Sequence, residues 1–544
     1  MIFSLLLLIT LLICLYGFSF ILKLALVGNK ENFAIGNIDI VYGIILLVFI
    51  LILTNFFFPI KYSIFPLFLI GVFSFIYLLN KKKIKIRYIF RNLIALLILF
   101  YVSSANGPIY DTQLYHHQIL NWSYEYKIVF NLVSLEERFG MSSPWHLLLS
   151  LGNFKINETY LASLVNFIPF FILISEFLNA KEGKLSYSKI YLIFANIFIF
   201  FFSLIHPFQN GTILMNLGSL GSDTAGSIFF ILTIYFFLKC NENFKVEFYN
   251  LTLIFSALSI FCKISNIPLL FLVIALIYQS KFLYLKLKIN LFILILLLTW
   301  FLRNFIISGC LIYPVSISCS DLDFFSSKDS IENYSNVIKS FARTAPNYEN
   351  FMNLNFSINS YKWFLPWFNN YFIKSSITQI MSLLTIIFVT PFIKSLIYDK
   401  ENLYIKTVLI VSFIITFILW LQAPDIRFAV GMLISIPLVL LIFSFKLEFL
   451  EKFNFLIKNI LILIFPLLIL KNFQNYNFLF EKSLFSREYK TESIIKTTSV
   501  EGFDIFVNNN AGGFCYDVVL ICLLKDKKIK LSKNKFNYLH FRSN

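Results

Sequence analysis

The chain has 544 residues, of which 58% are hydrophobic and only 14% are charged, and its formal net charge is +17. Soluble domains carry about 25% charged residues, so this composition excludes an ordinary soluble enzyme and predicts an all-α polytopic membrane protein. The sequence contains no P-loop, no GxGxxG and no CxxC pair, and therefore lacks the usual signals of nucleotide or structural zinc binding.

Long apolar stretches recur from the start of the chain to residue 473. A membrane-spanning helix needs about 20 apolar residues, and fewer when other helices surround it. The first stretch lacks the basic start and the cleavage site of a signal peptide, so it is predicted to be a retained helix. The stretches predict about 12–14 spans, in chain order 3–26, 38–59, 63–80, 88–105, 158–178, 190–206, 224–240, 248–262, 265–280, 289–307, 376–397, 405–422, 428–445 and 459–473.

Lysine-rich loops predict how these spans are oriented. If all of them cross, six basic segments fall on one side, and short loops rich in Lys and Arg stay in the cytoplasm. The positive charge is therefore interpreted as an orientation signal of a cytoplasmic-membrane protein, with no nucleic-acid partner. The six segments are 80–87, 179–189, 239–245, 281–288, 394–406 and 446–458.

The opposite side receives the longer polar segments. A transmembrane domain at 1–473 is predicted to carry outer loops at 106–157 and 308–375, and 474–544 is predicted to be a small extracytoplasmic C-terminal segment. A loop of the length of 308–375 is too long to be a simple connector, so short helices or strands are expected within it.

The first outer loop begins with the most unusual stretch of the sequence, "NGPIYDTQLYHHQILNWSYEY". On a helix, Asp111 and Tyr115 share one face, with Trp122 further along. Asp111 and His116 are candidates for catalysis, and Trp122 for stacking on a sugar. The structural alternative is a capping aspartate, a packed histidine and a belt of interfacial aromatic residues.

Further carboxylates follow along the chain. Glu137 next to Arg138 could hold a sugar hydroxyl or a phosphate, or the two could form a solvated surface pair with Glu136 nearby. Asp223, in "GSLGSDTAG", is either a ligand-binding acid behind small residues or the N-cap of the next span.

Four cations are predicted on the outer side, although Lys and Arg are expected mainly in cytoplasmic loops. Lys263, Arg303, Arg343 and Arg427 lie where few basic residues are expected, which suggests a phosphate at headgroup level as their counter-anion. Snorkelling is the alternative for Lys263, and Arg427 could pair with Asp425, two residues before it.

Together these residues predict a site that uses a lipid-linked phosphate. Asp111, His116 and Glu137 are the catalytic candidates, because a carboxylate can take the proton of an acceptor hydroxyl. Arg138, Lys263, Arg303 and Arg427 are the candidates for binding the donor phosphate, and Asp223, Arg343, Asp425 and Trp122 are further candidates. No cofactor is expected, although a divalent metal is not excluded by the residues present.

Four cysteines lie in outer segments, where an oxidising compartment permits disulfides. Cys310 and Cys319 are close in sequence, and so are Cys515 and Cys522, so each pair could form a disulfide.

Several of these motifs resemble those of a known group of membrane enzymes. The chain resembles the GT-C superfamily of membrane glycosyltransferases, and more closely an uncharacterised family of bacterial multi-pass membrane proteins related to them. The resemblance is carried by "YDTQLYHHQILNW", "NLVSLEERFGMSSPWHLL", "GSDTA", "CKISNIP", "WFLRNFIISGCLIYP", "ARTAP", "APDIRFAVG" and "FCYDVVLICLL".

The resemblance implies a GT-C-like bundle in which Asp111 is the base. Many GT-C enzymes have an acidic pair in the first loop, whereas this chain has "DT", which favours a metal-independent mechanism. The expected function is transfer of a sugar from a polyprenyl-phosphate donor to a glycan, lipid or protein acceptor on the periplasmic face of the bacterial inner membrane. The alternatives are a polysaccharide polymerase, which uses polyprenyl diphosphate, and a non-enzymatic transporter or flippase of lipid-linked glycans.

Overall fold

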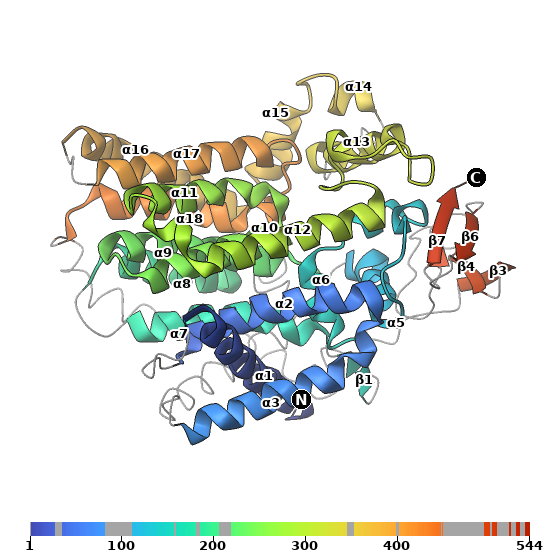
Figure 1. The fold of residues 1–544 in the computed structure, drawn as a ribbon. Coiled ribbons are helices and arrows are strands. Elements are labelled where there is room, and N and C mark those ends of the chain that lie inside the picture. Colours follow the sequence, from blue (N-terminus) through green and yellow to red (C-terminus); the bar gives the residue numbers. More distant parts are fainter. Residues whose placement is uncertain are drawn as a thin grey trace.

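The computed structural model describes most of the chain. The described residues are 2–27, 35–81, 111–156, 159–160, 162–180, 185–205, 219–344, 353–398, 402–447, 449, 494–500, 503–508, 522–523, 529–533 and 539–543. Long helices lie roughly side by side in a bundle, and shorter elements gather at one end of it (Figure 1). The predicted spans 88–105 and 459–473 lie outside the described residues.

Seven described helices are long and apolar enough to cross a membrane. Their composition shows a helical membrane protein, as the sequence predicted. They are α1 (Ile2–Val27), α2 (Ile40–Phe57), α3 (Ile64–Asn80), α9 (Asp223–Glu242), α12 (Lys288–Ser308), α16 (Ser376–Tyr398) and α17 (Leu403–Trp420).

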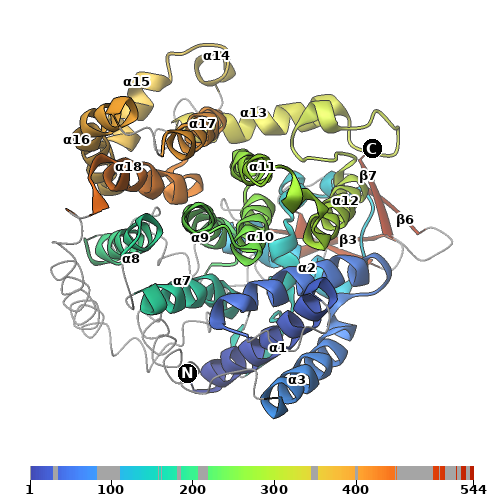
Figure 2. The same ribbon diagram turned by 60° about the vertical axis from the view of Figure 1, so that its left-hand side comes forward.

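Further apolar helices overlap the other predicted spans in the described part of the chain. Most of them are shorter than a full span. They are α7 (Phe167–Ala180), α8 (Tyr187–Ile205), α10 (Val246–Cys262), α11 (Leu270–Gln279) and α18 (Val430–Ser444). The predicted span 158–178 is wrong in its first half, which forms a strand at 159–160 and a 3-10 turn at 162–166, so that the α-helix begins only at Phe167. Figure 2 shows α9 and α10 in the interior of the bundle, with other helices on several sides.

Small residues allow α9 to approach its neighbours closely. A Cβ added at Gly226 would lie 3.0 Å from the Cβ of Cys262, and the Ser259 hydroxyl donates to the Gly226 carbonyl at 3.1 Å. A Cβ added at Gly431 on α18 would lie 2.7 Å from the carbonyl oxygen of Ser227. Because helix backbones come this close only where side chains are small, the start of α9, the end of α10 and the start of α18 meet at one end of the bundle.

The two long predicted loops contain short helices, as expected. In 106–157 and in 308–375 these helices pack on the end of the bundle rather than running along it (Figure 1). They are η3 (Thr112–His116), α5 (His117–Glu125), η4 (Leu132–Ser134), η5 (Glu137–Met141), α6 (Pro144–Ser150), η10 (Ser316–Ser318), α13 (Lys328–Thr344), α14 (Leu354–Ser357), α15 (Phe364–Trp367) and η12 (Phe368–Phe372).

Single helical turns connect the longer helices. Pro268 lies near the end of one of these turns, two residues before α11 begins, where its missing backbone N–H removes no helical hydrogen bond of α11. The turns are η1 (Asn37–Asp39), η2 (Ile60–Tyr62), η6 (Ala162–Asn166), η8 (Ile264–Leu269), η9 (Leu283–Lys286) and η13 (Ile426–Phe428).

The C-terminal segment adds strands to an otherwise helical protein. β3 and β4 pair antiparallel and β5 joins β4 in parallel, while β6 and β7 form a second antiparallel pair. The backbone of β7 exchanges hydrogen bonds with Phe130, and Asn131 donates to the Phe541 carbonyl at 2.9 Å. The strands are β1 (Lys155–Ile156), β2 (Thr159–Tyr160), β3 (Ile494–Val500), β4 (Phe503–Asn508), β5 (Cys522–Leu523), β6 (Ile529–Lys533) and β7 (Leu539–Ser543).

Candidate functional site

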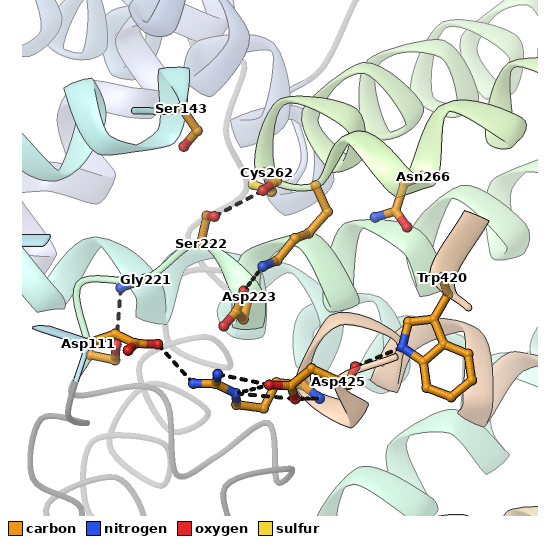
Figure 3. A network of polar contacts seen from close by, with 12 residues as sticks. Asp111, Ser143, Gly221, Ser222, Asp223, Cys262, Asn266, Trp420 and Asp425 are labelled. Atoms are coloured by element: carbon orange, nitrogen blue, oxygen red, sulfur yellow. Dashed lines mark hydrogen bonds and ion pairs between the residues drawn. The ribbon is translucent and has the colours of Figure 1, made fainter. Parts of the chain in front are cut away.

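Arg427 connects two aspartates that are far apart in the sequence. Its Nη1 lies 2.9 Å from Oδ2 of Asp111, and its Nη2 lies 2.9 Å from Oδ2 of Asp425. Dashed lines at the labelled Asp111 and Asp425 in Figure 3 mark these contacts. The pair of Arg427 and Asp425 that the sequence allowed is therefore present, and Asp111 is added to it.

Asp425 accepts hydrogen bonds in addition to its ion pair with Arg427. It caps η13 by accepting from the backbone N–H of Arg427 at 2.9 Å, and the Tyr371 hydroxyl donates to it at 3.1 Å. Burial would raise the pKa of Asp425, but the Arg427 charge and these hydrogen bonds outweigh burial and keep the pKa below its ordinary value. Asp425 therefore stays ionised and fixes the guanidinium in place.

A second ion pair lies beside the first. Lys263, which ends α10, pairs with Asp223 at the first turn of α9 (Figure 3). The Lys263 ammonium also lies 3.8 Å from the ring centre of Phe428, which follows Arg427. The close packing of α9 against α10 and α18 brings these two pairs together, so the four chain segments form one acid–base network.

The network, defined as Asp111, Asp223, Lys263, Asp425 and Arg427, has more acids than bases. Three carboxylates face two cations, which leaves one net negative charge when all five are ionised. Asp111 is the most exposed of the three acids, with 24% of its side chain accessible. Among the described residues, its Oδ1 has no hydrogen-bond donor, so this oxygen can accept a proton.

Two buried histidines adjoin the network. The rings of His116 and His146 lie 5.4 Å apart, and both side chains are buried. Burial is the main reason that the pKa of His116 falls to about 3, and the charges of Lys263 and Arg427 lower it further, against the opposing effect of Asp223. His116 is therefore neutral, and a catalytic role for it would be as a hydrogen-bonding group.

Arg303 differs from the other predicted cations. Its side chain is 2% exposed, and its Nη1 and Nη2 donate to the carbonyl and the hydroxyl of Ser142 at 3.1 and 3.0 Å. No carboxylate in the described part of the chain lies within ion-pair distance of it.

The ion pair of Arg138 and the backbone contact of Glu137 involve residues other than those of the network. Arg138 lies 3.5 Å from Glu136, and Glu137 beside it offers its backbone carbonyl to the Tyr313 hydroxyl at 2.8 Å.

Arg343 and Trp122 contact residues outside the network. Arg343, on α13, donates to the Ser357 carbonyl at 2.9 Å and lies over the Trp363 ring. Trp122 is buried and packs edge-on against Phe541 of β7.

Sequence reasoning missed three residues at this end. His146 and Ser142 lie in "MSSPWHLL", in the same loop as Asp111, and the Ser143–Pro144 start of a helix was a recognisable signal for a turn that presents them. Tyr371 carried no local signal, because tyrosine is common at membrane interfaces.

Cys310 and Cys319 form a disulfide, as the sequence allowed. Cys14, Cys240 and Cys262 are buried and free. The pairing of Cys515 with Cys522 falls outside the described residues. In the described part of the chain, no three His, Cys, Asp or Glu side chains are grouped closely enough to hold a metal ion.

Residues 1–434 match the model of a family described as Domain of unknown function (DUF8201). The match covers well over half of the chain, so the chain belongs to this family. No curated protein and no solved structure matches it.

Proposed function

We propose that this member of the DUF8201 family is a membrane glycosyltransferase of the GT-C type. It transfers a sugar from a polyprenyl-phosphate donor to a glycan, lipid or protein acceptor of the cell envelope, on the extracytoplasmic face. The observation that carries the proposal is the position of Asp111, a partly exposed carboxylate held by Arg427 in a network with Asp223, Lys263 and Asp425.

The network suits the chemistry of sugar transfer. The acceptor oxygen forms a bond to the anomeric carbon of the sugar while the bond from that carbon to the phosphate oxygen breaks, and the phosphate leaves with the electron pair. Asp111 takes the proton of the acceptor hydroxyl through Oδ1, which has no donor among the described residues, and Arg427 holds the carboxylate in position through Oδ2.

The location at an outer face has support of its own. The Cys310–Cys319 disulfide lies in the loop after α12, which contacts the segment 111–156 through the hydrogen bond from the Tyr313 hydroxyl to the Glu137 carbonyl at 2.8 Å, and disulfides persist in oxidising compartments. The lysine-rich loops of the sequence, such as 281–288, favour the opposite end as cytoplasmic.

Replacement of Asp111 tests this function. We expect Asp111→Asn to lower sugar transfer by roughly 10²–10⁴-fold, because general base catalysis contributes about that much. The amide has nearly the size of the carboxylate, so the protein is expected to reach the membrane in normal amounts. The measurement is sugar incorporation into envelope glycans of cells that carry each variant, with protein abundance in the membrane measured in parallel.

Asp321→Asn is the matched control. Asp321 is an acid in the 308–375 loop, 73% exposed and paired with Lys328, away from the network. It should leave transfer unchanged. Full transfer by Asp111→Asn would remove Asp111 as the base and, with it, the proposed mechanism.

A further inference from the structure

An apolar cavity lies between the first half of α1, the start of α3 and the segment that follows α6. Its volume is about 130 Å³, and it is partly open to its surroundings. Of the described residues that line it, Thr10 and Cys14 alone have polar side chains, and none is charged. An apolar cavity of about 150 Å³ stays dry in other proteins and takes up small apolar molecules. This cavity is therefore suited to hydrocarbon rather than to water.

A tight contact between α1 and α3 keeps the space from closing. A Cβ added at Gly17 of α1 would overlap the carbonyl oxygen of Gly71 in α3, and one added at Gly71 would lie 2.8 Å from the Cα of Cys14. Two helix backbones that already touch cannot approach further. Because the surrounding structure cannot collapse into it, an empty cavity at this place would cost stability.

The cavity reaches the lipid-facing side of α3. Figure 2 shows α3 at the edge of the bundle, beside α1. Only 17% of its apolar span is buried inside the protein, and Phe65 is 68% exposed. Phe68 of the same helix is 38% exposed and also lines the cavity. In a membrane these side chains meet lipid, so a lipid chain can enter the cavity from the bilayer.

The cavity lies close to the membrane surface, at the end of the bundle where α5 lies. Its α3 residues, such as Ile64 and Leu67, belong to the first two turns of that helix. Lys61, just before α3, pairs with Glu125 of α5 at 2.6 Å, and the neighbouring Tyr62 is exposed. Charged residues and tyrosines of this kind mark the interface between membrane and water. The cavity is therefore in the leaflet next to α5, a short way below its headgroups.

We propose that this cavity binds one acyl chain of a bilayer phospholipid. Selection of a prenyl phosphate would need cations, and no described residue that lines the cavity is charged. A site that recognises hydrocarbon alone is filled by the hydrocarbon most concentrated around it, and in a bilayer that is the acyl chain. The site does not depend on the function proposed above.

The bound chain has a structural consequence for the outer loop. Leu151 and Phe154 line the cavity and belong to the described segment 111–156, which begins with Asp111. An acyl chain between them and α1 replaces empty space by packing contacts. The lipid therefore stabilises this segment against the helices of the bundle.

A photoactivatable lipid tests the site. Full-length protein is reconstituted in vesicles of phosphatidylglycerol with a trace of phosphatidylglycerol that carries a diazirine in one acyl chain, then purified in detergent and irradiated. We expect the lipid that stays bound to label α1, the start of α3 or the segment after α6, as located by mass spectrometry of peptides. Labels spread evenly over all lipid-facing helices overturn the proposal.

Two variants that fill the cavity make the test specific. Leu11→Trp and Leu151→Trp replace lining residues by a larger side chain, so each should lower the labelling roughly tenfold, because the indole takes the space of the chain. Leu294→Trp is the matched control, since Leu294 is 53% exposed on the lipid-facing side of α12, and its labelling should equal that of the wild type. Undiminished labelling in both filling variants overturns the site.

Melting temperatures give a second readout. Phosphatidylglycerol added to delipidated protein should raise the melting temperature of the wild type and of Leu294→Trp, and should raise that of the filling variants less. Without lipid, the filling variants should be as stable as the wild type or more stable, because they fill an empty space. Failure of both to fold contradicts the proposal, because the space would then not accept a larger group.

Competition identifies the source of the chain. Phosphatidylglycerol without the diazirine should displace the photoactivatable lipid from the detergent-purified protein at a lower concentration than farnesyl phosphate does. Displacement by farnesyl phosphate at the lower concentration would assign the cavity to a prenyl chain and overturn the phospholipid assignment. Full sugar transfer by Asp111→Asn together with the expected labelling would keep this site and remove the glycosyltransferase mechanism.

Discussion

At the scale of single residues, the polar end of the protein is dominated by charges whose partners come from distant parts of the chain. Arg427 is bonded to Asp111, more than three hundred residues before it in the sequence. Burial would lower the pKa of Arg427, but Asp425 and Asp111 outweigh burial and raise it, so the guanidinium keeps its charge. The pair of Arg427 and Asp425 is costly to break, because removal of either partner leaves the other charge buried, whereas Arg427 keeps Asp425 as its partner when Asp111 is replaced.

The buried histidines make folding stability depend on pH. The folded-state pKa of His116 is about 3, below the ordinary unfolded value of about 6.5. Between these values the unfolded chain binds more protons than the folded protein does. Stability is therefore expected to be level above about pH 6.5 and to fall as the pH drops below it, by up to about 1.4 kcal/mol per pH unit for each such histidine.

His116→Gln should make this pH dependence shallower, because glutamine does not titrate. The measurement is denaturant unfolding of the purified protein at several values between about pH 4 and pH 7. His146 retains its own contribution, so part of the slope is expected to remain. If the free energy of unfolding depends on pH equally steeply in the wild type and in the variant, the pKa of His116 in the folded protein is close to its ordinary value, and the expectation is wrong.

At the scale of elements, the site depends on how closely three helices approach one another. Gly431 lies one helical turn after Arg427, and Ser227 lies one turn after Asp223. The contact between Gly431 and Ser227 therefore decides how near the charged ends of α18 and α9 lie. In the same way, Gly226 decides how near α9 lies to the end of α10, beside Lys263.

Gly431→Ala should push α18 away from α9. The added Cβ would lie 2.7 Å from the Ser227 carbonyl oxygen, which is backbone and cannot rotate away. The expected loss of stability is about 1–3 kcal/mol, as for other overpacked interiors. Thermal unfolding in detergent measures it. Gly36→Ala is the control, because its added Cβ would meet only the Asp39 carboxylate, at 3.8 Å. An equal loss of stability in this control would mean that the contact between α18 and α9 is not the cause.

At the scale of the whole molecule, the C-terminal strands lie at the end of the bundle where α5 lies (Figure 1). β7 contacts the loop that follows α5, through Phe130 and Asn131, and it packs on Trp122. The segment beyond the matched family region therefore supports the loop that begins with Asp111.

Cysteine labelling tests the orientation that the lysine-rich loops predict. Tyr361, in the 308–375 loop, and Tyr398, at the end of α16, are 91% and 83% exposed. A thiol reagent that cannot cross membranes should label Tyr361→Cys in intact cells, and should label Tyr398→Cys only after the cells are permeabilised. The unsubstituted chain gives the background from its own cysteines. Labelling of Tyr398→Cys alone in intact cells would place the polar end in the cytoplasm.

The sequence by itself determined the membrane class and the positions of the seven described helices that are long enough to span, because a bilayer of given thickness demands a long apolar run wherever the chain crosses it. It also indicated Asp111, Asp223, Lys263, Asp425 and Arg427 one by one, as charged residues at the ends of apolar runs. Their joint arrangement depends on contacts between helices that are distant in the sequence, and local patterns do not record such contacts. Only the tertiary structure could therefore decide that Lys263 and Arg427 have acidic partners, while the buried Arg303 has none among the described residues.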